Sequence, residues 1–279
     1  MATWDPSSRR RGTGTASTPR DMPEPAIVRL LPLGTGSILM GAGRSAAGYL
    51  LEANGLRILV DCGPGTLLRL DEAGVGPTTI DYVLLSHFHP DHHADLLGLL
   101  FHRQNRSHAD AQRLTIVAPR GVRAILEAWR TVYGSWVEHP PEDVVEIDEG
   151  DFELGTVRAR AFAAKHSPPA FCYRFDLGSG TTLAYSGDTE DCPGLVEACR
   201  GVDLCWMECS FPDDEHTPGH MTPARVRGVL EAAQPRVAAL THFYPPMQAL
   251  LADEARWRAL WGGLATRVIV LRDLEEVRP

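Results

Sequence analysis

The chain has 279 residues and 44% of them are hydrophobic, which is enough to bury the core of one large domain or two small ones. Its 27 basic and 36 acidic residues give a net charge of −9, which argues against an extensive nucleic-acid-binding surface. No stretch approaches the roughly 20 apolar residues that are needed to span a bilayer, so we expect no membrane segment.

The N-terminal part differs in composition from the rest. Residues 1–25 contain mainly Ser, Thr, Pro, Gly and Arg without an apolar period, so we expect a disordered extension followed by a single domain over 26–279. The arginine run at 9–11 is not an export signal, because no apolar segment follows it. The six cysteines lack the spacing of a disulfide framework or a zinc ribbon, which favours a reducing cytoplasm.

Apolar patterns predict strands and helices in both halves of the chain. We expect strands at 27–31, 48–51, 57–60, 82–85 and 114–117, and then at 157–163, 171–176, 182–185, 204–207, 237–240 and 268–271. We expect helices at 66–73, 94–106, 122–133, 194–200, 223–233 and 253–261. This order allows two sheets to pack face to face beneath outer helices, with functional loops at one edge.

The most specific pattern follows the apolar run at 82–85. Residues 86–92 read Ser-His-Phe-His-Pro-Asp-His, and such nitrogen and oxygen donors suit zinc, or iron or manganese, whereas structural zinc sites usually use paired thiolates. Alternate side chains of an extended stretch share a face, so His87 and His89 can converge on one metal ion. Pro90 favours a turn, after which Asp91 and His92 would point from the start of a helix toward a second ion. The alternative is that these histidines only decorate a polar turn.

The order H-x-H-x-D-H, with further segments across 27–245, resembles the metallo-β-lactamase superfamily. Residues 58–65 resemble its strand-ending aspartate and glycine turn. Three later segments resemble its ribonuclease Z branch: Lys-His-Ser at 165–167 followed by Phe-Cys-Tyr-Arg at 171–174, Tyr-Ser-Gly-Asp-Thr at 185–189, and Leu-Thr-His-Phe at 240–243. The resemblance implies a four-layer αββα sandwich.

The same resemblance implies a set of site residues. Two divalent metal ions, Zn²⁺ in the first place with Mn²⁺ or Fe as alternatives, would be held by two groups of three residues and a bridging carboxylate. These ligands are His87, His89 and His166 for one ion, Asp91, His92 and His242 for the other, and Asp188 between them. Asp61 would orient the ligand loop from behind, unless it is an ordinary residue of the turn that it opens.

His220, in Pro-Gly-His-Met-Thr-Pro at 218–223, opens an expected helix. In the ribonuclease Z branch a histidine at this place acts on phosphodiesters with the support of an upstream acid, which here is Glu208. An imidazolium there could protonate a leaving group or bind a phosphoryl oxygen. We expect His220, Glu208 and Asp91 to be catalytic; the alternative for His220 is a solvated loop residue.

The expected reaction is hydrolysis, since two divalent ions can activate a shared water and polarise a scissile group. Ribonuclease Z commonly carries a transfer-RNA-binding arm between the third histidine and the bridging aspartate, but here one short hairpin fills the interval. We therefore expect a small phosphodiester, such as a cyclic nucleotide, as the substrate. The alternatives are hydrolysis of a lactone, lactam or thioester, transfer RNA 3′ processing, and a non-catalytic metal-binding accessory role. A homodimer is compatible with the sequence.

Overall fold

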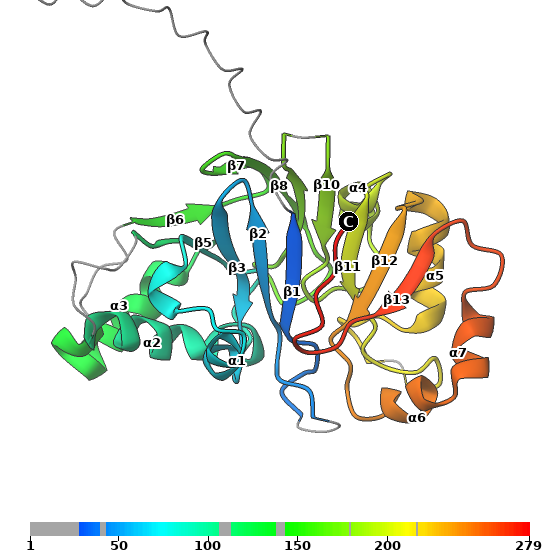
Figure 1. Ribbon diagram of the computed structural model, residues 1–279, viewed down its shortest axis with the longest axis horizontal. Coiled ribbons are helices and arrows are strands. Elements are labelled where there is room, and N and C mark those ends of the chain that lie inside the picture. The colour runs from blue at the N-terminus through cyan, green and yellow to red at the C-terminus, as the bar shows by residue number, and fades with distance from the viewer. Residues whose placement is uncertain (1–27, 40–42, 106–112, 138–142, 179, 216) are drawn as a thin grey trace, which may run out of the picture.

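The computed structural model describes residues 28–39, 43–105, 113–137, 143–178, 180–215 and 217–279. The extension expected at 1–25 lies outside these ranges. Within them the chain forms two mixed sheets, flanked by helices on both sides (Figure 1). None of the described helices has the length and hydropathy that are needed to span a membrane.

The first half of the chain forms a sheet whose six described strands lie in sequence order, β1 to β6. These strands are β1 (Arg29–Gly34), β2 (Gly48–Ala53), β3 (Leu56–Cys62), β4 (Tyr82–Leu84), β5 (Thr115–Pro119) and β6 (Asp143–Ile147). The helical elements of this half are α1 (Thr66–Glu72), η1 (Pro77–Thr79), α2 (Pro90–Asn105), α3 (Val122–Tyr133) and η3 (Gly134–Val137). Leucines and other aliphatic residues of α1, α2 and α3 pack against the outer face of the sheet.

The second half forms a sheet of seven described strands in the order β13-β12-β11-β10-β9-β8-β7. These are β7 (Gly150–Leu154), β8 (Val157–Ala163), β9 (Phe171–Asp176), β10 (Thr182–Tyr185), β11 (Leu204–Glu208), β12 (Val237–Thr241) and β13 (Arg267–Val270). The helices are α4 (Pro193–Cys199), α5 (Pro223–Ala233), α6 (Met247–Ala252) and α7 (Glu254–Leu260), and they cover the outer face of this sheet. The expected αββα sandwich is therefore confirmed.

An aromatic core joins the inner faces of the two sheets. Trp206 stacks on Phe175 and on Tyr185, with ring centroids 5.8 and 5.1 Å apart. The tyrosines of this core are buried, yet each hydroxyl finds a partner: Tyr173 donates to the carbonyl of Leu85 over 2.7 Å. Such pairing is what makes a buried phenol tolerable in an apolar core. These hydroxyls tie the core to the strand ends where the ligand loops begin.

Several features of the fold differ from the expectations of the sequence, among them helix α6, which has no counterpart among the expected helices. Helix α2 begins at Pro90, not at residue 94 as expected, because proline suits the first turn of a helix, where its missing N–H costs nothing. Strands β6 and β7 have no counterpart among the expected strands. In β7 polar residues alternate with apolar ones and burial alternates in the same way, as in a strand that has one face in water, whereas β6 reads Asp-Val-Val-Glu-Ile and exposes Val145.

Candidate metal centre

The predicted ligands meet at one edge of the sandwich. Strands β10, β11 and β12 run parallel to one another, and so do β3, β4 and β5, so their carboxyl ends face the same side in each sheet. His87 and His89 follow β4, Asp188 follows β10, and His242 follows β12 directly. Loops at the carboxyl ends of parallel strands are the usual place for a site in such sheets.

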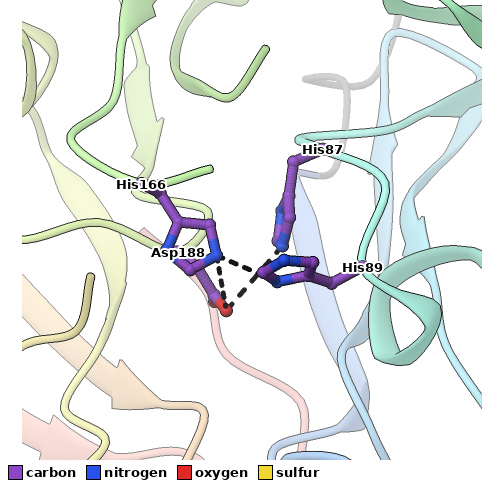
Figure 2. A group of neighbouring side chains, drawn as sticks. All are labelled: His87, His89, His166 and Asp188. Atoms are coloured by element: carbon purple, nitrogen blue, oxygen red, sulfur yellow. Dashed lines mark hydrogen bonds and ion pairs between the residues drawn. The ribbon is translucent and has the colours of Figure 1, made fainter. Parts of the chain in front are cut away.

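Four predicted ligands form the first group, and Figure 2 shows them converging. The Nε2 atoms of His87 and His166 each lie 3.9 Å from Oδ2 of Asp188. His89 presents Nδ1, which lies 3.0 Å from Nε2 of His166. The inward atoms of the group are all within 4.8 Å of one another, as the ligands of one ion would be.

The second group consists of Asp91, His92 and His242. Nε2 of His242 lies 3.4 Å from Oδ2 of Asp91 and 3.2 Å from Nε2 of His92. The other oxygen of Asp188, Oδ1, lies 3.2 Å from Nε2 of His92 and 3.5 Å from Nε2 of His242. Asp188 thus directs one oxygen to each group, which is the arrangement expected of a bridging carboxylate.

The chemistry of these atoms fits two cations. Nε2 of His87 and Oδ1 of Asp188 are buried without a hydrogen-bond partner among the described residues, although buried polar groups are normally paired. The imidazoles also face one another nitrogen to nitrogen at 3.0 and 3.2 Å, where a shared cation satisfies both lone pairs. Imidazole and carboxylate donors suit zinc, manganese or iron.

Asp61 holds the ligand loop of the first half. It is fully buried at the end of β3 and accepts hydrogen bonds from the backbone N–H and the hydroxyl of Ser86, from Nδ1 of His92 and from the hydroxyl of Tyr185, all at 2.7 to 2.8 Å. The predicted contact between Asp61 and the ligand loop is therefore confirmed. Because Asp61 accepts a hydrogen bond from Nδ1 of His92, Nε2 of that imidazole points toward the other members of the second group. Burial lowers the pKa of His92, but Asp188 and Asp61 outweigh it and raise the pKa well above its usual value.

Three other predicted ligand imidazoles are oriented in the same manner, through the nitrogen that faces away from the site. Nδ1 of His87 pairs with Oγ of Ser86 at 3.0 Å, and Nδ1 of His242 pairs with Oγ of Ser210 at 3.1 Å. Nδ1 of His166 donates to the carbonyl of Gly219 over 2.9 Å. Gly219 has φ of 86°, and a Cβ there would lie 2.8 Å from Nδ1 of His166, so only glycine fits.

Two residues of the site have a left-handed backbone conformation, which residues other than glycine rarely adopt. Asp61 has φ of 55° and His242 has φ of 57°. Such strain costs of the order of 1–3 kcal/mol each and persists where the surroundings over-determine it. Both residues follow or end a buried strand and turn a polar side chain into the site, so the strain accompanies their positioning.

His220 and Glu208 lie together beside the two groups. Glu208 ends β11, is fully buried, and accepts hydrogen bonds from Nδ1 of His220 at 3.2 Å and from the backbone N–H groups of Thr189 and Met221 at 2.6 and 3.0 Å. Nδ1 of His220 is 3.9 Å from Oδ2 of Asp188. Burial lowers the pKa of His220, but the hydrogen bond and charge of Glu208 and the charge of Asp188 outweigh it and raise the pKa to about 9. His220 is therefore a buried residue whose charged form two carboxylates favour, not a solvated loop residue.

Sequence reasoning missed several contacts of the site. Ser86, Ser210 and Tyr185 orient the ligands or their supporting carboxylates, but a serine or tyrosine near a motif carries no signal of its own. The backbone N–H of Ile38 donates to Oδ2 of Asp91 over 3.2 Å, which brings the loop after β1 to the site. A backbone donor leaves no trace in the sequence.

Comparisons with known proteins agree with this arrangement. The family described as "Beta-lactamase superfamily domain" matches residues 56–243, which is more than half of the chain. A ribonuclease Z from Mycobacterium sp. (strain KMS) is 30% identical over 271 residues, covering 88% of this chain and 94% of that protein.

Solved structures share the fold. The metallo-beta-lactamase fold protein YhfI from Bacillus subtilis matches with a TM-score of 0.75 and 20% identity, covering 90% of this chain and 99% of that one. The short form of human tRNase Z matches with a TM-score of 0.71 and 23% identity, covering 89% and 98%. The fold of this family implies divalent metal ions. The chain is thus a hydrolase of the metallo-β-lactamase superfamily, from its ribonuclease Z-like branch.

Proposed function

We propose that this hydrolase is a phosphodiesterase that holds two divalent metal ions and acts on small phosphodiesters such as cyclic nucleotides. The ions would be bound by the seven predicted ligands, with zinc as the first choice. When bound they would lower the pKa of a water and neutralise charge on the phosphoryl oxygens. The observation that carries the proposal is the His220–Glu208 pair beside the two groups.

The pair suits the departure of an alkoxide from phosphorus. In hydrolysis an oxygen of water bonds to phosphorus, the bond from phosphorus to the leaving oxygen breaks, and that oxygen needs a proton. Glu208 engages Nδ1 of His220 at 3.2 Å and favours its charged form, so Nε2 is the nitrogen that can give the proton. Glu208 is a positioning residue, since it acts through His220.

The preference for a small substrate rests on the hairpin between His166 and Asp188. Strands β9 and β10 pair antiparallel with Thr182 opposite Asp176, and the hairpin that they form, from 171 to 185, takes up most of this interval. The described residues between the two ligands leave no length for an inserted arm. Such an arm is the device by which ribonuclease Z commonly grips transfer RNA.

A second candidate is transfer RNA 3′ processing. It is favoured by the ribonuclease Z that matches 88% of this chain at 30% identity. The match covers 94% of that ribonuclease Z, so this chain corresponds to nearly the whole of that protein. The two candidates share the metal centre and differ in the size of the substrate.

One panel of substrates separates these functions. Metal-loaded protein would be assayed on bis-p-nitrophenyl phosphate, cyclic nucleotides, a precursor transfer RNA, an acyl-homoserine lactone and a chromogenic β-lactam. We expect metal-dependent cleavage of the first two, and two metal ions per chain by elemental analysis. Asp188→Ala should lose both metal and turnover, whereas Asp151→Ala, which removes an exposed carboxylate of the edge strand β7, should keep both.

The outcomes that contradict the proposal are distinct. Faster metal-dependent cleavage of the lactone or the lactam would replace phosphodiester hydrolysis with carbonyl hydrolysis. Efficient processing of the precursor transfer RNA, with slow turnover of cyclic nucleotides, would make the chain a ribonuclease. A metal content near zero after reconstitution would refute the metal centre itself.

A further inference from the structure

Two aromatic side chains stand at the border of the metal centre and take no part in the proposed hydrolysis. The rings of Phe211 and Tyr244 stack with their centroids 4.4 Å apart and their planes 26° from parallel. Both residues are only partly buried, unlike the aromatic residues of the core. A stacked aromatic pair that stays accessible to solvent beside a catalytic centre is a surface on which a ligand ring can lie.

The pair is fixed relative to the reacting groups. Tyr244 contacts the rings of His220 and His242 edge-on, with centroids 5.5 and 5.6 Å away, and Phe211 contacts His220 at 5.7 Å. The backbone N–H of Tyr244 donates to the carbonyl of Ser210 over 3.2 Å, next to Phe211 in the chain. A ring that stacked here would therefore belong to the same molecule whose phosphorus lies at the metal centre.

The charge next to the pair disfavours a long nucleic acid. Asp213, Asp214 and Glu215 follow Phe211 and are all exposed. Carboxylates at this place repel the successive phosphates of an RNA strand, since binding of such strands depends on cations that neutralise phosphates. A mononucleotide brings one phosphate to the metal centre and an uncharged base to the rings, so it avoids this repulsion.

We propose that Phe211 and Tyr244 form the nucleobase-binding surface of this site, and that the preferred substrate is a small phosphodiester containing a nucleoside. This inference rests on the proposed phosphodiesterase function. Stacking of a base on an aromatic side chain tolerates every base, because each has a π-face. The surface thus selects for the presence of a base and not for its identity.

Two substrates with one leaving group test the inference. Thymidine 5′-p-nitrophenyl phosphate and methyl p-nitrophenyl phosphate both release p-nitrophenolate, and they differ by the nucleoside. We expect wild-type protein to prefer the thymidine compound through a lower KM. Phe211→Leu and Tyr244→Leu should each reduce this preference by about tenfold, in line with the usual worth of one stacked base.

Two further variants show whether the stacked rings themselves cause the preference. Tyr244→Phe keeps the ring and should keep the preference, which distinguishes the ring from the hydroxyl. Trp136→Leu removes an aromatic residue that is 59% exposed and lies on η3, and it should leave the preference for the thymidine compound unchanged. If both leucine variants slow the two substrates equally, the rings only support His220 and the inference is wrong. An unchanged preference in both variants would overturn it as well.

A binding experiment keeps the inference testable if the phosphodiesterase proposal fails. Should wild-type protein cleave neither compound, calorimetry would compare AMP with ribose 5-phosphate, which differ by the base. Tighter binding of AMP that is lost in both leucine variants, with thermal melting near that of wild type, supports the aromatic surface. Equal binding of the two ligands by the wild-type protein refutes it.

Discussion

Asp61 and Glu208 occupy comparable places in the two halves of the molecule. Each ends a buried strand, Asp61 near the end of β3 and Glu208 at the end of β11, and each is fully buried. Each also accepts a hydrogen bond from Nδ1 of an imidazole and from the hydroxyl of a serine. The two sheets therefore provide the same device, a carboxylate that orients a histidine.

The imidazoles that they orient have different surroundings. His92 is fully buried, and its Nε2 lies 3.2 Å from both His242 and Asp188, so both of its nitrogens face partners. His220 is buried as well, at 8% exposure, but it borders the partly exposed rings of Phe211 and Tyr244. An imidazole with partners at both nitrogens suits a metal ion, whereas the imidazole of His220, held at Nδ1 by Glu208, suits proton transfer to a substrate.

The largest expected effect comes from removing the imidazole of His220. His220→Gln should lower phosphodiester turnover by about 10²–10⁴-fold while metal content stays near that of wild type, because proton donation is lost and the ligands are not. Glu208→Gln should give a smaller loss in the same direction. Steady-state kinetics and elemental analysis of the same preparations measure both quantities.

A matched control uses another histidine close to the site. His93 stacks on Trp129 and belongs to neither ligand group. His93→Gln should therefore change turnover far less than His220→Gln. Loss of metal from His220→Gln in parallel with activity would show instead that this imidazole is a ligand, and the difference between the two halves would disappear.

A smaller effect is expected from replacing the carboxylate of Asp61. This change should lower metal affinity and not proton transfer. Asp61→Asn should weaken metal binding by about 10–100-fold, since the amide no longer holds His92 with a charge-assisted hydrogen bond. Competition with a chelator measures this affinity. Tyr185→Phe removes one hydrogen bond to Asp61 and should give a milder change with the fold intact. Equal weakening by Glu208→Gln would contradict the division of roles.

The first four candidate ligands could be predicted from the sequence because their spacing is local. His87, His89, Asp91 and His92 lie within six positions, and the strand and helix around them follow from apolar periodicity. The predicted strands at 157–163, 171–176 and 182–185 have the bounds that the structure shows. The later ligands are recognised by the resemblance of short segments, since nothing in their spacing fixes their distance in space.

The supporting hydrogen bonds could not be predicted in this way. Ser86, Ser210 and Tyr185 reach their partners across 25, 32 and 124 residues of sequence. Such contacts depend on how the two sheets pack, and a common residue type gives no hint of them. Strands β6 and β7 escape prediction for another reason, because each carries two charged residues among five, which weakens the apolar signal on which a strand prediction relies.

The smallest expected effect is on how the stability of the metal-free protein depends on pH. It distinguishes the imidazole of His220 from that of His92. Glu208 and Asp188 raise the pKa of His220 from 6.5 to about 9 despite its burial. A group with a raised folded-state pKa stabilises the fold fully below its unfolded pKa, near 6.5, and this contribution is lost as the pH rises through about 9. Its upper bound, from the size of the shift, is about 3 kcal/mol.

Wild-type protein stripped of metal should therefore lose stability against urea between pH 6.5 and 9, relative to His220→Gln measured under the same conditions. Other shifted groups, such as His92, are present in both proteins and cancel in the difference. If the two curves run parallel across this window, His220 is neutral in the folded chain and cannot be the proton donor. If the difference in stability between wild type and variant instead narrows as the pH rises, wild type is losing the stabilisation that a charged His220 gains beside Glu208, which the variant lacks at every pH.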